Sequence, residues 1–463
     1  MDKDKHNNPN DFDDEERQLV LDFENTVLRG GQQFFDVDEM EVIMDYYLEV
    51  NDLEPLQRAV EYAEQLYPRS TSVRLRRAHL LIAREQYEPA LKIIRQLRRE
   101  APDDTDVAYS LGVAYGAIGE HEKAIELFHE AAADGWMLGR IYANIAEEYY
   151  HLQDFDEAIR YYKLALDTDS YDDSTLYNYV DTAIQSGAVE DAIEYFKSFV
   201  GEHPYSAEGW HCLGTVYREQ GLYELATDAY EYAIAIDKGQ LQFYIDLSFA
   251  QEMSGQASEA VSTLLRARDI SGERNLIYRF VANIYVRIGN NDMAMIYLRK
   301  ALEENPDDPI TLASLAIVLS DDRSAAQPLL RKALRLAPDN IDVLDAAADF
   351  YDRVGNFEMA NDYFERVVSN DNCNEYMCQR YVAFLYRHKV YDILVQFAEE
   401  SLDIYPADPF YSTYLAACYY YTDRFNRCSR MLPNCNPQLL CEICPEVVDH
   451  PRLGPLVPHH NAP

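Results

Sequence analysis

Four potential metal ligands follow one another near the end of the chain. Cys441 and Cys444 form a C-x-x-C pair, with Cys435 before it and His450 after it. Thiolates and an imidazole can close a tetrahedral zinc site, and a C-x-x-C pair can also exchange a disulfide. The pair falls in an expected short helix with apolar neighbours, where a free cysteine packs as a small hydrophobic residue. We expect packing, and therefore predict no metal and no cofactor.

Other motifs of catalysis do not occur in the sequence. It contains no glycine-rich phosphate loop, no H-E-x-x-H zinc motif and no nucleophile elbow, and its eleven histidines are scattered. Carboxylates are abundant, so counting alone leaves a paired acid and base open. Because a repeat pattern assigns nearly all residues to a scaffold, as described below, we predict a protein that is not an enzyme.

The chain carries a large negative charge. Its 41 Lys and Arg residues against 81 Asp and Glu residues give a net charge of -40 at pH 7. Such a protein repels phosphate backbones and anionic lipid headgroups, so nucleic acid is not an expected partner. The N-terminus shows no apolar run after its first charges, and no stretch approaches the roughly 20 apolar residues of a membrane span. We expect a cytoplasmic protein with reduced thiols and no membrane insertion.

A period of 34 residues organises most of the chain. Small residues recur at the eighth, twentieth and twenty-seventh positions of each unit, as in Gly214, Ala226 and Ala233. The register holds through six units. The next unit fits only if two residues are deleted from its central turn at 320–323, after which the frame resumes. A steric reason exists for each residue type: Gly or Ala lets two helices approach, aromatic residues fill the gap to the next hairpin, and Pro ends the second helix.

This pattern resembles the tetratricopeptide repeat (TPR) over about residues 37–432. The resemblance implies an all-α superhelical solenoid of about twelve helix-turn-helix units. A single hairpin cannot bury its apolar face, so stacking supplies the core and both ends need caps. We expect five segments: a disordered N-terminus at 1–12, an acidic helix and turn at 13–36, the TPR array at 37–436, a capping helix at 437–450 and a disordered tail at 451–463.

The resemblance also implies a binding face. In this family the first helix of each unit lines a concave groove, with roughly the second, fifth, ninth, twelfth and thirteenth positions exposed. One unit then presents a basic triplet able to grip a carboxylate or acidic peptide: Arg279, Asn283 and Arg287. A later unit presents an acidic stripe able to hold a basic peptide: Asp342, Asp345, Asp349 and Asp352. The alternative is that these charges are solvated or pair with their neighbours.

Some TPR domains share a carboxylate clamp built from three successive units. Arg279 and Asn283 can stand for its first pair, but Ser314 replaces the expected Asn, and Asp342 and Ala346 replace the expected Lys and Arg. Capture of a chaperone's acidic C-terminus is therefore not predicted.

A basic cluster interrupts the acidic chain within one hairpin. It consists of Arg69, Arg74, Arg76, Arg77, Arg84, Lys92, Arg95, Arg98 and Arg99. The cluster can dock an acidic partner, or the acidic segment from Asp11 to Glu16 can fold back and neutralise it.

These observations favour a non-catalytic scaffold or adaptor that binds a partner peptide or helix in the TPR groove. One alternative is a chaperone-like holder of unfolded clients, for which aromatic residues such as Phe249, Phe280 and Tyr386 at groove positions are suitable. The other is a non-catalytic subunit of an enzyme complex.

Overall fold

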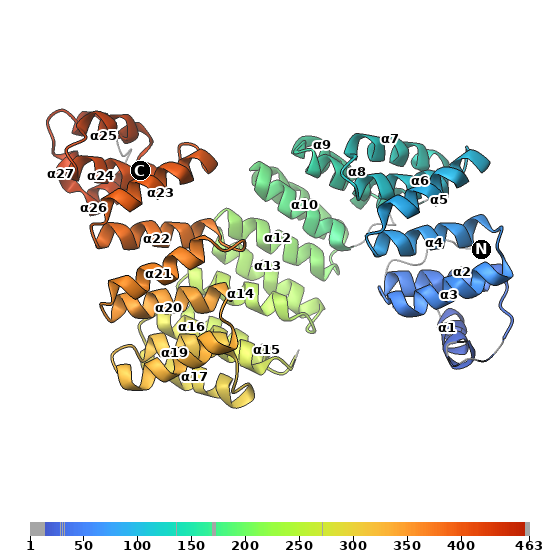
Figure 1. The fold of residues 1–463 in the computed structure, drawn as a ribbon, viewed down its shortest axis with the longest axis horizontal. Helices are drawn as coiled ribbons and strands as arrows, with labels where there is room; N and C mark the ends of the chain where they lie inside the picture. The colour runs from blue at the N-terminus through green and yellow to red at the C-terminus, as the bar shows by residue number, and fades with distance from the viewer. Residues whose placement is uncertain are drawn as a thin grey trace. The chain divides into compact units, whose positions relative to one another are not determined.

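The fold is described from a computed structural model of the chain, which describes residues 14–458 apart from 28, 30, 32, 136, 169–172 and 271. The chain divides into two compact units, Met1–Gln256 and Ala257–Pro463. Within the described residues the regular structure is entirely helical, and successive helices pack as antiparallel pairs (Figure 1). The predicted all-α architecture of helix pairs is confirmed.

The described residues of the first unit form an opening helix followed by six helix pairs and one further helix. Their bounds are α1 Asp14–Thr26, α2 Val37–Glu49, α3 Leu53–Leu66, α4 Thr71–Ala83, α5 Tyr87–Glu100, α6 Thr105–Gly116, α7 His121–Ala131, α8 Leu138–His151, α9 Phe155–Leu166, α10 Asp173–Ser186, α11 Val189–Glu202, α12 Ala207–Glu219, α13 Tyr223–Ile236 and α14 Leu241–Met253.

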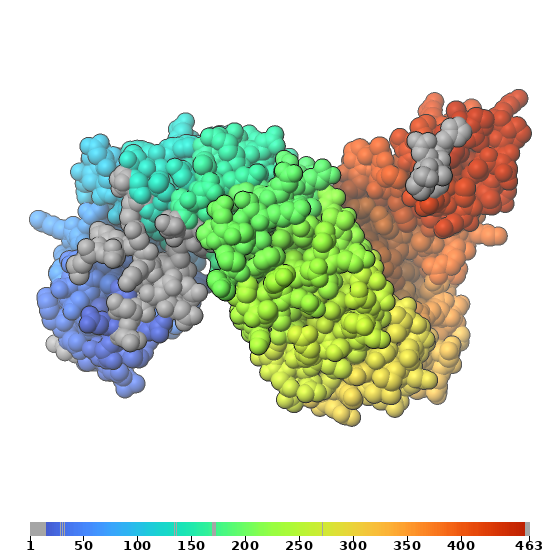
Figure 2. Space-filling view, turned by 180° about the vertical axis from the view of Figure 1, so that it is seen from behind, coloured from blue at the N-terminus to red at the C-terminus, as the bar shows by residue number. Residues whose placement is uncertain are grey.

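In the second unit, the residues that the structure describes form one helix, five pairs and the helices of the C-terminal end. Their bounds are α15 Ala257–Ala267, α16 Arg274–Arg287, α17 Asn291–Glu304, α18 Pro309–Val318, α19 Arg323–Leu336, α20 Ile341–Arg353, α21 Phe357–Val368, α22 Glu375–Arg387, α23 Tyr391–Ile404, α24 Pro409–Tyr421, α25 Phe425–Met431, α26 Pro437–Ile443 and α27 Pro445–Val448. Figure 2 shows the same chain from behind in a space-filling view, coloured by residue number.

Small residues set the approach of the two helices in a pair. A Cβ added to Gly214 would lie 2.6 Å from the ring of Tyr230, and one added to Gly112 would lie 2.8 Å from the ring of Phe128. Other units place a buried Ala at the same position, such as Ala282 and Ala348. The aromatic ring of the second helix therefore rests directly on the backbone of the first, which explains the small residue at the eighth position.

Polar caps begin most first helices. The side chains of Ser70, Asp104, Ser206, Asp308 and Asn340 each accept a hydrogen bond from a backbone N–H in the first turn. Such a cap satisfies one of the free N–H groups at a helix start. Because the cap recurs at the same place in the unit, it fixes where each first helix begins.

The irregular parts of the pattern also have structural counterparts. The unit with two residues deleted has a first helix, α18, of only ten residues. The expected opening helix corresponds to α1, and α26 and α27 lie in the range expected for the cap. Residues 1–12 lie outside the described part, as do 459–463 of the expected disordered tail. The rest of that tail contains a short 3-10 helix, Gly454–Leu456, with Leu453 and Val457 buried beside it.

No helix in the described part of the chain combines the length and apolar character needed to cross a membrane.

Candidate functional site

The first helices of the pairs lie on the inner side of the curvature within each unit. Several successive first helices contact one another, as α2 contacts α4, α10 contacts α12 and α18 contacts α20. No two successive second helices approach as closely within the described residues. A stack that is closer along its first helices bends toward them. This inner face is the one that the family resemblance associates with ligand binding.

The basic triplet on α16 is partly engaged within the chain. The Arg279 guanidinium lies 3.4 Å from a carboxylate oxygen of Asp308, and both side chains are largely buried. Asp308 also caps α18 by accepting a hydrogen bond from the Thr311 N–H. Asn283 is half-buried and Arg287 is exposed. Arg279 therefore links two neighbouring repeats, and Arg287 is the member of the triplet that faces solvent most openly.

More members of the acidic stripe on α20 than of the basic triplet on α16 form ion pairs with other parts of the chain. Arg380 of α22 binds the carboxylates of both Asp345 and Asp349. Asp352 lies 2.7 Å from Arg387 and 2.7 Å from His388. Three of the four acids thus pair with the next first helix. Asp342, at the start of α20, is the exposed member.

Burial shifts the pKa of one acid in the stripe, Asp345. Desolvation raises the pKa of Asp345, although the adjacent charge of Arg380 acts in the opposite direction. One of the two carboxylate oxygens of Asp345 is buried without a hydrogen-bond partner among the described residues. The charge of Arg380 therefore opposes the effect of burial on the pKa of Asp345.

Comparable links join first helices of the first unit. They include Arg76 with Asp45 at 2.7 Å, His79 with Ser110 at 2.8 Å, Asn144 with Tyr109 at 3.0 Å, Asn178 with Glu147 at 3.1 Å and His211 with Asp246 at 2.8 Å. Each link spans about one repeat in sequence. Polar residues of the inner face thus serve largely to join neighbouring repeats.

The most buried of these links was not anticipated from the sequence. His211 of α12 and Asp246 of α14 are both buried, and Asp246 also accepts hydrogen bonds from Arg218 and Gln242. Burial pushes the pKa of Asp246 upward, but the hydrogen bonds and the positive charge of Arg218 bring it below its ordinary value. A His–Asp pair can act in catalysis, but here Asp246 is shared among His211, Arg218 and Gln242 and joins two repeats. His211 and Asp246 are 35 residues apart, one repeat period plus one, and this spacing is the feature of the sequence that could have indicated their contact.

The basic hairpin formed by α4 and α5 is partly neutralised by its neighbours. Arg74 lies 2.6 Å from Glu100 of the same hairpin, and Arg98 binds Glu130 of α7. Arg76 has two acidic neighbours on α2, Asp45 and Glu41, at 2.7 and 4.0 Å. Arg69, Lys92, Arg95 and Arg99 are exposed. Asp11 to Asp13 of the acidic segment expected to fold back lie outside the described residues.

The candidate zinc ligands do not gather in one place. Cys435 and Cys444 are buried in the C-terminal core, Cys441 is exposed, and His450 stacks on Phe425 with ring centroids 5.9 Å apart. Across the described residues no group of three or more His, Cys, Asp or Glu side chains is arranged to hold a metal ion.

A different pair of thiols does come together. The sulfur atoms of Cys373 and Cys378 lie 3.5 Å apart at the start of α22. Their C-x₄-C spacing is not one of the motifs singled out in the sequence. The signal was the Asn374 cap between the two cysteines, since a helix start folds the preceding residue back toward the first turn.

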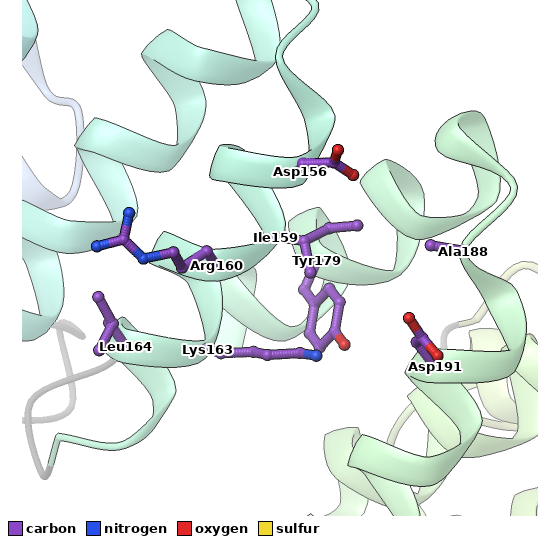
Figure 3. A pocket seen from close by; sticks show the side chains of 8 residues that line it. All are labelled: Asp156, Ile159, Arg160, Lys163, Leu164, Tyr179, Ala188 and Asp191. Atoms are coloured by element: carbon purple, nitrogen blue, oxygen red, sulfur yellow. The ribbon is translucent and has the colours of Figure 1, made fainter.

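A pocket of about 440 Å³ lies between the second helices α9 and α11, with Tyr179 of α10 at its base (Figure 3). It is lined by Asp156, Ile159, Arg160, Lys163, Leu164, Tyr179, Ala188 and Asp191. The Lys163 ammonium lies 5.6 Å from the centroid of the Tyr179 ring. Burial raises the pKa of Tyr179, so its hydroxyl keeps its proton, and that hydroxyl has no hydrogen-bond partner in the described structure. The pocket can hold a polar group beside the Tyr179 hydroxyl.

Sequence comparison finds the same repeat. Profiles of the tetratricopeptide repeat match residues 56–113, 143–207, 177–240 and 278–308. The TPR repeat-containing protein YpiA of Bacillus subtilis is 22% identical over 279 residues, which are 52% of this chain and 66% of that protein. The human protein O-mannosyl-transferase TMTC1 is 30% identical over 131 residues, which are 28% of this chain and 14% of that protein. The chain therefore spans no more than about two thirds of the length of either relative.

The crystal structure of yeast Tom70 covers 85% of this chain and 98% of its own, with 13% identity and a TM-score of 0.47. The matched sequence repeats all lie within the succession of helix pairs described above. The chain belongs to the tetratricopeptide-repeat proteins.

Proposed function

We propose that this chain is a non-catalytic interaction scaffold of the cytoplasm, which binds a peptide or helix of a partner protein along its first-helix face. The observation that carries the proposal is that helix pairs of one repeat family account for nearly all described residues from 37 to 431. That range leaves no room for a separate catalytic domain. The similarity to a transferase covers only 14% of that enzyme, so it brings no catalytic activity to this chain.

The part of the face best suited to a partner lies on α16, α18 and α20. Arg287 and Asp342 are its exposed charges, and Val286, Ile310 and Ile317 are half-buried apolar residues on the same helices. Arg279, Asp345, Asp349 and Asp352 are engaged with other repeats, so they support the face instead of contacting a ligand directly. The complementary partner is a segment with apolar side chains between an acidic and a basic residue.

Affinity capture with a matched charge change tests this proposal. Arg287→Glu alters the inner face, and Arg299→Glu makes the same change on an exposed position of the second helix α17. We expect one partner protein to be retained by the wild type and by Arg299→Glu, and to bind Arg287→Glu about tenfold more weakly, because a charge on the rim of the contact is reversed. Circular dichroism should show all three proteins equally folded.

Equal retention of the partner by all three proteins would show that binding lies elsewhere. A second outcome would favour a client holder instead. On α14, Phe249 and Met253 are 43% and 49% exposed and stand one turn apart. Broad, weak binding of unrelated apolar peptides, reduced by Phe249→Ser and not by Arg287→Glu, would favour that function.

A further inference from the structure

Two thiols face each other where the chain enters α22. Cys373 lies in the turn after α21, Cys378 lies in the first turns of α22, and their sulfur atoms are 3.5 Å apart. Both residues are partly exposed. No other pair of thiols in the described part of the chain makes such a contact. This pair is also independent of the C-x-x-C motif at the C-terminal end.

The backbone around the pair is fixed by hydrogen bonds. The Asn374 side chain caps α22 by accepting from the Met377 N–H at 3.0 Å, and the Cys373 N–H donates to the Asn370 carbonyl at 2.9 Å. The turn therefore keeps the two sulfur atoms near each other. A disulfide has an S–S distance of about 2.05 Å, so the two sulfur atoms need to approach by about 1.5 Å, a distance within the range of small side-chain rotations.

We propose that Cys373 and Cys378 are an oxidation site, at which a hydroperoxide converts the two thiols to an intrachain disulfide. The Cys373 thiolate attacks the peroxide oxygen, the O–O bond breaks, and the departing oxygen takes up a proton and leaves as water or an alcohol. The sulfur of Cys378 then attacks the sulfenic sulfur of Cys373, loses its proton, and displaces hydroxide, which leaves as water. Two thiols lose two electrons and one hydroperoxide gains them.

The surroundings of the two sulfurs favour this order of events. Burial, followed by the hydrogen bond with Cys373, raises the pKa of Cys378 to about 12, so Cys378 stays a thiol at neutral pH. Cys373 is therefore the thiol expected to react first, and Cys378 loses its proton as it attacks the sulfenic sulfur of Cys373. The six other thiols differ from this pair: Cys441 is exposed, and Cys212, Cys418, Cys428, Cys435 and Cys444 are buried.

The disulfide would close a small ring around the Asn374 cap and tie the preceding turn to α22. That helix also carries Arg380, which binds two acids of α20. We therefore expect the oxidised protein to exchange the amide hydrogens at the start of α22 more slowly than the reduced protein. This inference does not depend on the proposed function, because it concerns only the thiols and their turn.

Peptide mass spectrometry, after treatment of the folded full chain, tests the proposal. Trypsin releases residues 367–380 as one peptide, because Arg366 precedes it, Arg380 ends it, and neither Lys nor Arg lies between. After brief treatment with hydrogen peroxide, unfolding and alkylation, we expect this peptide without alkyl groups and lighter by two hydrogen atoms. Dithiothreitol should restore the doubly alkylated form. Cys441→Ser should leave the reaction unchanged, and Cys373→Ser should abolish it.

Two results would overturn the proposal. One is a peptide that stays doubly alkylated at a peroxide concentration that has already oxidised Cys441. The other is Cys373 oxidised to the sulfinic acid while Cys378 remains alkylated, since a resolving thiol would have intercepted the sulfenic acid. The wild-type measurement decides by itself, so the proposal remains testable even if Cys373→Ser disturbs the turn.

Discussion

Arg380 is the residue on which the interpretation of the acidic stripe depends. If its contacts to Asp345 and Asp349 are structural, removing the guanidinium leaves two neighbouring carboxylates on α20 without their cation. A hydrogen bond to a charged group contributes about 1.5–3 kcal/mol, and the side chains retain about a fifth to a third of their exposure, which reduces that value. We expect Arg380→Met to lower the opening free energy of α20 and α22 by about 2 kcal/mol.

The pH dependence has a definite sign. Burial raises the pKa of Asp345 in the folded state, so the folded protein is favoured when this group is protonated and loses stability as pH rises through the folded-state pKa. Arg380 opposes that rise. Without it the folded-state pKa of Asp345 moves further up, and the loss at neutral pH grows. The effect of Arg380→Met should therefore be larger at pH 7 than near pH 4.

Native-state hydrogen exchange is the suitable assay, because a repeat array does not unfold as a single two-state body. An effect of about 2 kcal/mol corresponds to about 30-fold faster exchange in α20 and α22. Arg353→Met is the matched control, since Arg353 is half-exposed and lies 3.8 Å from Asp349 on the same helix, a pair expected to contribute under about 0.5 kcal/mol. If Arg380→Met behaves like Arg353→Met at pH 7, the acids are solvated and the reasoning is refuted.

Three further predictions concern packing and metal. Gly214→Ala should destabilise α12 and α13 by about 1–3 kcal/mol, because the new methyl group would lie 2.6 Å from the Tyr230 ring. Gly201→Ala, with open space around its Cβ, should be neutral or slightly stabilising. Hydrogen exchange compares the two variants, and equal effects would refute the close-packing argument. Tyr179→Phe should leave the amide hydrogen exchange of α10 unchanged or slower, because the removed hydroxyl has no hydrogen-bond partner in the described structure. A loss of more than about 1 kcal/mol in the opening free energy of α10 would show that the hydroxyl is bonded to water or a ligand. Elemental analysis of protein purified in the presence of zinc should find no stoichiometric metal, because Cys441 is exposed while Cys444 is buried, and one zinc per chain would contradict this placement.

The helix pairs were predictable because their steric requirement repeats in every unit. Gly214 has to be small wherever the Tyr230 ring crosses its backbone, and the same demand returns with each period. Periodic demands leave a periodic signal in the sequence. The contacts of Arg279 and Asp345 leave a weaker one, because their partners lie in the next repeat and are not visible when one unit is considered alone. For that reason the sequence identified the inner face but not which of its charges remain exposed.

The acidic stripe shows that the partner of an inner-face charge can nevertheless be found in the sequence about one repeat period away. Arg380 stands 35 residues after Asp345 and 31 after Asp349, the offsets that bring side chains of successive first helices together. At the same offsets from Asp342 stand Met377 and Cys373, neither of which carries a basic group, and Asp342 is the member of the stripe that stays exposed. A charge on the inner face is thus satisfied inside the stack when the neighbouring repeat offers its opposite at these offsets. Ligand specificity in such an array should come from the positions where that complement is missing, which the sequence can reveal only when each unit is compared with the next.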